Sequence, residues 1–226
     1  MASKAFKRKE RVKRQKAQRK PKSDKKYAKY AIYTVFVVLA VYLSVTVALK
    51  PPFLPGVDDD PSTGPSDAAV TVIQFGCYTC PYTKEFNNNV LPQLMEEYAG
   101  RINFVFRSAP IYSNAGAKLA HMAADCANEQ GKFFEYSKLL FKGPSTFDKA
   151  ILRGFAESLD LDMVMFNDCL DSKKYEDEVD KDYQDAKKAG VSKTPTLFVN
   201  GIRIDGARDK ALLERLFDDM LEEEGS

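Results

Sequence analysis

The longest apolar pattern in the chain covers residues 30–49, which carry no charged side chain. A helix of about twenty apolar residues is as long as the hydrocarbon core of a bilayer is thick, about 30 Å. Tyr30 and Tyr33 stand at one end, where aromatic rings favour the headgroup region, and Lys29 and Lys50 flank the segment. The pattern therefore predicts a membrane-spanning helix at 30–49, with a cleaved signal peptide as the alternative.

Beyond residue 66 the apolar positions predict the order β-α-β, then a helical segment, then β-β-α. The strands appear as short β-branched or alternating runs, and the helices as apolar residues three or four apart. Asn200-Gly201 separates the last two strands and is a hairpin signal. We expect strands at 70–75, 102–107, 196–199 and 202–204, and helices at 81–99, throughout 114–190, and at 209–224.

Residues 50–66 are dense in Pro, Gly, Ser and Asp and contain no apolar run that would build a core. Such a composition predicts a flexible linker. A chain of 226 residues has room for one globular domain and an appendage. We therefore expect the folded domain at 67–226, with the helical segment 114–190 as an insertion.

Charge divides the chain at the same place. Residues 1–29 contain 14 Lys or Arg and two acidic residues, whereas the rest carries 20 basic and 30 acidic side chains, a net charge of −10. A basic segment beside a membrane span stays in the cytoplasm, so we expect a cytoplasmic tail at 1–29 and an extracytoplasmic C-terminal domain. The tail can also contact anionic lipid or RNA, but no nucleic-acid module accompanies it, and we expect no specific nucleic-acid partner.

Candidate chemistry centres on Cys77 and Cys80. Pro81 follows Cys80 where the first strand gives way to a helix, and proline favours the first helical position, where an N–H would have no partner. Cys80 is then the N-cap residue, where free backbone N–H groups and the helix dipole favour the reactive thiolate. Cys77, three residues upstream, becomes its partner. With Cys77 at the cap instead, Pro81 would fall at the fourth helical position and crowd the first turn.

Zinc binding and inert thiols are the alternatives for this pair. Zinc would need further ligands, and the chain has one histidine, His121, and only two other cysteines. His121 falls in an Ala-rich helix and is expected to be a packed surface residue. A single histidine also argues against Ser-His or Cys-His hydrolysis and against multi-histidine metal chemistry. We expect no metal and no cofactor apart from the redox-active cysteines.

Three segments resemble the DsbA-like thioredoxin family: 75–86 around the cysteines, 124–136 in the helical part, and 190–201 before the hairpin. The last is the most specific, because Thr-Pro-Thr before an apolar strand looks like the family's cis-proline loop. The resemblance spans about 68–224. It implies an α/β thioredoxin fold interrupted by an α-helical subdomain.

The resemblance also implies roles for Thr194 and Pro195. Pro195 matches the family's cis-proline, which packs against the active-site sulfur. A cis bond turns the chain sharply and exposes the backbone of Thr194, with which an extended substrate peptide can pair. An ordinary proline at the start of a strand is the alternative.

The chain departs from the family pattern at one position. The family reads Cys-Pro-x-Cys, and Thr83 stands where its second cysteine would be. Three outcomes stay open: Cys77 acts as an alternative partner, Cys80 acts alone with the Thr83 hydroxyl donating to its thiolate, or only peptide binding remains.

Cys126 and Cys169 lie on apolar faces of the helical segment. Buried cysteines are often no more than small apolar side chains. If the domain lies outside the cytoplasm, a structural disulfide between them becomes plausible. Of the three pairings that four cysteines allow, we favour Cys77–Cys80 with Cys126–Cys169.

Together these features predict a membrane-anchored, extracytoplasmic thiol–disulfide oxidoreductase. Its expected partners are cysteine-containing protein substrates, a membrane or soluble thiol redox partner, and the lipid bilayer. Oxidase, reductase and isomerase activity all fit the motif, as does single-cysteine chemistry at Cys80. The alternative from another class is a non-catalytic, membrane-tethered peptide-binding or assembly factor.

Overall fold

The computed structural model describes residues 9–14, 24–48, 53–112, 114–206 and 209–224. The chain divides into two compact units, Met1–Pro52 and Phe53–Ser226. In the first unit, helix α2 spans Asp24–Ala48 and contains all of the expected membrane span except residue 49, which lies outside the described residues. Among the described residues, no helix has both the length and the apolar character needed to cross a membrane.

The second unit is built on a five-stranded mixed sheet in the order β1-β3-β2-β4-β5. Its central strands β2 (Val70–Gly76) and β3 (Ile102–Ser108) are parallel, which requires the crossover that the β-α-β pattern predicts. Strand β4 (Thr196–Val199) runs antiparallel to β2 and forms the expected hairpin with β5 (Ile202–Asp205). The thioredoxin-like α/β fold with a helical insertion is therefore confirmed.

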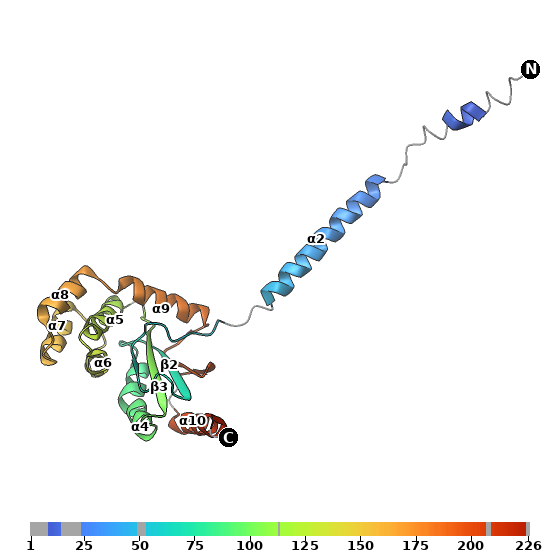
Figure 1. Ribbon diagram of the computed structural model, residues 1–226. Coiled ribbons are helices and arrows are strands. Elements are labelled where there is room, and N and C mark those ends of the chain that lie inside the picture. The colour runs from blue at the N-terminus through green and yellow to red at the C-terminus, as the bar shows by residue number, and fades with distance from the viewer. Residues whose placement is uncertain (1–8, 15–23, 49–52, 113, 207–208, 225–226) are drawn as a thin grey trace, which may run out of the picture. The chain divides into compact units, whose positions relative to one another are not determined.

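Figure 1 shows the helices of this unit around the sheet. Between β2 and β3 lie α3 (Pro81–Glu85), the π-helix η1 (Phe86–Val90) and α4 (Leu91–Glu97). The insertion consists of α5 (Ala115–Asn128), α6 (Phe133–Lys142), α7 (Lys149–Ser158), α8 (Met163–Ser172) and α9 (Glu176–Lys188). Helix α10 (Lys210–Glu224) is the last element.

The single helix expected at 81–99 is interrupted. Pro92 lies in the first turn of α4 and has no N–H to give to the carbonyl of Asn88 one turn earlier. The chain passes this point through the wider turn of the π-helix. Such turns are rare and are often found at functional sites.

The two faces of the sheet bury different cores. Val72 and Phe104 are opposite one another in the β2–β3 register and point to the larger core, which also contains residues of α4, α5, α6 and α10. Ile73 and Val105 point to the other face and pack with Ala186 of α9. The alternation along β2 and β3 decides which residues meet which helices.

The linker expected at 50–66 is wrong for residues 53–66, which belong to the folded unit. Strand β1 (Ser62–Thr63) pairs with β3, and the Phe106 N–H donates to the Pro61 carbonyl over 3.0 Å. Gly64 has a φ of +107°, and a Cβ there would lie 2.1 Å from the Ile102 carbonyl oxygen. The Pro- and Gly-rich composition here therefore allows the backbone to pack closely against the edge strand β3, and it does not indicate a flexible linker. The domain therefore starts at Phe53 and not at Asp67.

Candidate active site

Cys80 lies at the N-cap of α3, with Pro81 in the first turn, as the Cys-Pro sequence predicts. Its backbone is extended, with φ −82° and ψ 122°. The Cys80 N–H donates to the carbonyl of Cys77 over 3.1 Å, closing a tight turn between β2 and α3. The end of a buried strand and the start of a helix thus fix both cysteines.

Cys80 is 6% exposed, and its sulfur lies 3.2 Å from the carbonyl oxygen of Thr194. The peptide bond between Thr194 and Pro195 is cis. Burial opposes ionisation of the thiol. Hydrogen bonding to the Thr194 side chain, to the Thr83 backbone and hydroxyl, and to the Tyr82 backbone outweighs it, so the pKa of Cys80 is lowered.

Thr83 occupies the position of the cysteine that the family pattern has. It is fully buried, and apart from this interaction with the sulfur its hydroxyl has no hydrogen-bond partner among the described residues. A threonine here cannot form a disulfide, but its hydroxyl can stabilise a thiolate at Cys80.

Cys77 lies beneath Cys80 and is fully buried. Its sulfur accepts a hydrogen bond from the Ile111 N–H at 3.3 Å and lies 3.2 Å from the Thr79 hydroxyl oxygen. Cys77, Cys80 and Ala117 form one small buried cluster, and both thiols are free. The disulfide expected between Cys77 and Cys80 is therefore not formed in this structure. Two buried thiols lie together, and Cys77 is the more deeply buried of the two.

Tyr78, between the two cysteines, anchors their loop in the insertion. Its ring stacks on Phe106 with centroids 5.2 Å apart, and its hydroxyl lies 2.7 Å from that of Ser137 on α6. Sequence reasoning did not single out this residue. A bulky aromatic side chain in the middle of a Cys-x-x-Cys motif could have indicated that the loop is anchored in the core.

The surface position expected for His121 is wrong. His121 is 1% exposed, its ring lies 4.6 Å from that of Tyr78, and its Nδ1 pairs with the Ser108 hydroxyl at 2.9 Å. Burial lowers the pKa of His121 to about 3, so the ring is neutral at physiological pH. It supports the cysteine loop as an aromatic neighbour.

Cys126 on α5 and Cys169 on α8 are joined by a disulfide, with Cα atoms 5.8 Å apart. The bond links two helices of the insertion that are 43 residues apart in the chain. It leaves Cys77 and Cys80 as the free cysteines of the protein. Disulfide exchange therefore has one pair of thiols available to it.

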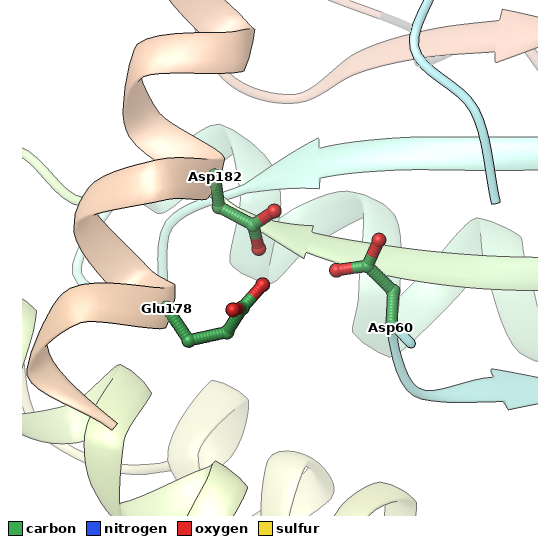
Figure 2. Close-up of side chains that lie close together, drawn as sticks. All are labelled: Asp60, Glu178 and Asp182. Carbon is green, nitrogen blue, oxygen red and sulfur yellow. The ribbon is translucent and has the colours of Figure 1, made fainter. Parts of the chain in front are cut away.

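A second polar cluster surrounds Arg107 at the end of β3. Its guanidinium is 1% exposed and lies 2.7 Å from Asp182, 3.1 Å from Asp185 and 3.1 Å from Asp60. Figure 2 shows Asp60 facing Asp182 and Glu178 of α9. Burial first, and then repulsion by Asp182, raise the pKa of Asp60 to about 8.

This cluster holds the segment before β1 against β3 and α9. Sequence reasoning missed it, although a charged residue at a core-facing strand position was a signal. The carboxylate oxygens of Asp60, Glu178 and Asp182 lie within 4.8 Å of one another. Arg107 supplies the positive charge that such a group needs.

Comparison with known proteins agrees with this geometry. A thioredoxin family matches residues 57–219. Disulfide bond formation protein D of Bacillus subtilis is 28% identical over 65% of this chain and 70% of its own length. The Na(+)/H(+) antiporter NhaA 1 of Salinispora arenicola is 35% identical over 66% of this chain, which spans only 23% of that protein.

Solved structures give the same picture. BdbD from Bacillus subtilis, in its oxidised form, superposes with a TM-score of 0.68 and 26% identity over 75% of this chain and 96% of its own. Alpha-DsbA1 of Wolbachia pipientis, at 23% identity, shares the fold with a TM-score of 0.67 over 75% of this chain and 94% of its own. The chain therefore belongs to the thioredoxin family, in the DsbA-like form in which a helical insertion interrupts the fold.

Proposed function

We propose that this protein is a thiol–disulfide oxidoreductase that uses Cys80 as its nucleophile and Cys77 as its resolving cysteine. The observation that carries the proposal is the position of Cys80. Cys80 occupies the N-cap position of α3, its sulfur lies beside the Thr194 carbonyl of the cis Thr194-Pro195 bond, and its pKa is lowered. The names of the disulfide-forming relative and of the DsbA structures support the same activity.

The exchange proceeds in two steps from a Cys77–Cys80 disulfide. A substrate thiolate attacks the Cys80 sulfur, the bond between Cys80 and Cys77 breaks, and Cys77 leaves as a thiolate. A second substrate thiolate then attacks the substrate sulfur of the mixed disulfide and releases Cys80 as a thiolate. The substrate dithiol loses two electrons and two protons. The cysteine pair gains the two electrons, and the protons pass to solvent or to the new thiolates.

The contacts of the two sulfurs suit these roles. Cys77 leaves into a site where the Ile111 N–H already donates to its sulfur at 3.3 Å. Cys80 leaves in the second step, and its lowered pKa favours the thiolate. A stabilised leaving thiolate makes the oxidised pair a stronger oxidant.

Cysteine-containing proteins are the proposed substrates. Thr194 is half-buried beside the Cys80 sulfur, where its backbone can pair with an extended chain. A hollow of about 400 Å³ at the start of α3 is lined by Pro81, Tyr82, Glu85, Phe86 and Val90. Tyr82 is 51% exposed there and offers an apolar surface to a substrate side chain.

The proposed location is extracytoplasmic, with residues 30–49 as a membrane anchor and a second thiol protein as redox partner. The basic residues 1–29 and the uncharged segment after them support this topology. The Cys126–Cys169 disulfide supports an oxidising compartment. Reduction runs the two steps in reverse: the Cys80 thiolate attacks a substrate disulfide, and Cys77 resolves the mixed disulfide. The reduction potential of the cysteine pair relative to that of its compartment decides the direction.

An exchange assay tests the activity. The purified full chain, in its oxidised form, is mixed with a peptide that contains two cysteines, and formation of the peptide disulfide is followed by mass. We expect one peptide disulfide per protein, and none with Cys80→Ala. A protein that binds the peptide but oxidises none of it would be the non-catalytic binding factor instead.

A further inference from the structure

An apolar pocket shares no lining residue with the hollow beside Pro81. It has a volume of about 300 Å³ and is lined by residues of β1, η1, α4, β3 and α6. Five phenylalanines dominate its lining: Phe104, Phe106, Phe133, Phe134 and Phe141. The other lining residues are Thr63, Asn87, Leu91, Pro92, Met95, Ser137 and Lys138.

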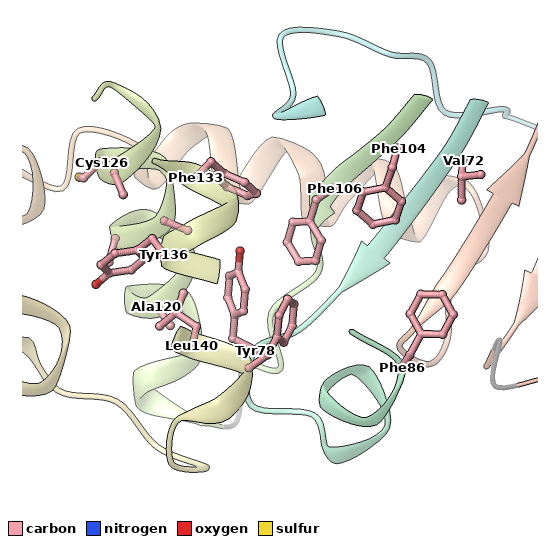
Figure 3. Packing of buried hydrophobic residues seen from close by; sticks show 14 of the residues in the cluster. Val72, Tyr78, Phe86, Phe104, Phe106, Ala120, Cys126, Phe133, Tyr136 and Leu140 are labelled. Atoms are coloured by element: carbon pink, nitrogen blue, oxygen red, sulfur yellow. The ribbon is translucent and has the colours of Figure 1, made fainter. Parts of the chain in front are cut away.

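The rings around this pocket face one another without filling it. Phe106 lies 5.9 Å from Phe133, and Phe104 lies 6.4 Å from Phe134, between ring centroids. Figure 3 shows Phe104 and Phe106 on β3 beside Phe133 on α6. At about 30 Å³ per water molecule the space equals about ten waters, which aromatic walls cannot hydrogen-bond. A pocket of this size and lining suits a small apolar ligand.

The polar groups of the pocket indicate the charge of such a ligand. The amide of Asn87 donates to the Thr83 carbonyl at 2.9 Å, and Ser137 pairs with Tyr78, so both are already engaged. Lys138 is exposed and is the one charged residue among those that line the pocket in the described structure. The carboxylate of Glu135 bonds Lys132 at 3.2 Å and is also attracted by the charge of Lys138. Lys138 therefore offers a positive charge in the pocket lining to which an anionic group of a ligand can bind.

We propose that this pocket binds an amphipathic monoanion, a carboxylate with an apolar chain or ring of about ten non-hydrogen atoms in all. The apolar part lies among the phenylalanines, and the carboxylate pairs with Lys138. Two lining residues are hydrogen-bonded to the segment that carries the cysteines: Asn87 bonds Thr83, and Ser137 bonds Tyr78. The ligand site is thus adjacent to the redox site but separate from its peptide-binding face.

Octanoate, octanol and acetate are the probes. Each is titrated into the full chain in one detergent and followed by calorimetry, and the heat of the same probe titrated into detergent alone is subtracted. We expect saturable binding of octanoate with one ligand per chain, weaker binding of octanol, and none of acetate. Absence of saturable octanoate binding would overturn the proposal.

Two lysine variants test the role of charge. Lys138→Gln removes the cation in the pocket lining, and Lys142→Gln removes another exposed lysine of α6 that does not line the pocket. We expect Lys138→Gln to weaken octanoate binding about fivefold and to leave octanol binding unchanged. Equal effects of the two substitutions on octanoate would contradict a specific ion pair.

Met95→Phe tests the cavity itself. Met95 is half-buried on α4, and a larger ring there should fill the pocket and abolish binding of both octanoate and octanol. Unchanged far-ultraviolet circular dichroism shows that the variant is folded. If it fails to fold, Leu91→Phe on the same helix replaces it. Full binding in a folded, filled variant would place the ligand elsewhere and refute the site.

Discussion

The sulfur of Cys80 lies 3.2 Å from the carbonyl oxygen of Thr194, although 114 residues separate the two in the chain. This contact joins the start of α3 to the loop before β4. It exists because β2 and β4 are neighbours in the sheet, so that the end of one lies beside the start of the other. A reactive thiol and a backbone that can bind a peptide are thereby placed in one site.

The first prediction concerns the ionisation of Cys80. In a Cys77→Ser background, alkylation of Cys80 by iodoacetamide should rise with pH and reach half its maximum below the value of about 8.5 for a free cysteine. Thr83→Val removes a hydroxyl that stabilises the thiolate, so it should raise the pKa of Cys80 and shift the curve to higher pH. Thr79→Val, beside Cys77, is the matched control and should leave the curve in place.

The second prediction concerns pH and the acidic cluster. Burial raises the pKa of Asp60 to about 8, against about 3.9 in an unfolded chain. Between these values the folded state holds a proton that the unfolded state has released, so this group lowers stability as the pH rises from about 4 to 8.

Urea unfolding at pH 5 and pH 8 measures this effect. Asp60→Asn should flatten the fall in unfolding free energy between the two pH values, because the amide stays neutral throughout. Asp58→Asn, whose side chain is 48% exposed, is the control. An unchanged slope in Asp60→Asn would show that Asp60 is ionised in the folded protein.

The third prediction concerns the disulfide. Mass mapping without reduction should find Cys126 joined to Cys169 in protein isolated from its native compartment. Replacing both with alanine should lower the unfolding free energy by about 4 kcal/mol on the chain-entropy model for a loop of 43 residues. Two free thiols in the native protein, or equal stability of the double variant, would argue against the bond.

The fourth prediction concerns topology. Protease added to intact cells should degrade an epitope placed after Ser226 and spare one placed after Ala2, because the basic tail holds the N-terminus in the cytoplasm. The cell-associated protein should keep its full mass of 25.4 kDa. Protection of both epitopes would place the domain in the cytoplasm, and loss of the N-terminal epitope from the mature protein would indicate a cleaved signal peptide.

Most of the fold was predictable because its strands and helices have strong local patterns. The β-branched run of β2 and the Asn-Gly turn between β4 and β5 need no tertiary information. Strand β1 was not predictable, because two residues in a Pro- and Gly-rich segment become a strand only through pairing with β3. The interruption of the helix before Pro92 was also not predictable, because a missing N–H does not by itself determine that the backbone forms a π-helical turn.

The candidate site divides in the same way. The N-cap position of Cys80 was predictable, because the proline that follows it favours the first position of a helix. The partners of Cys77 were not, since the Ile111 N–H reaches its sulfur from the loop after β3, 34 residues away. The burial of Arg107 likewise depends on carboxylates from α9 and from the segment before β1. Contacts between residues so far apart in the chain cannot be predicted from the local sequence.

The most direct test of the central claim is a trapping experiment with two single-cysteine variants. Full-length Cys77→Ser and Cys80→Ser are each mixed with a peptide activated as a mixed disulfide, and the products are analysed by mass without reduction. Cys77→Ser should form a stable bond between Cys80 and the peptide, because no resolving thiol remains. Cys80→Ser should form little or none, because Cys77 is fully buried. Trapping by Cys80→Ser with an inert Cys77→Ser would contradict the account, since Cys77 would then be the nucleophile.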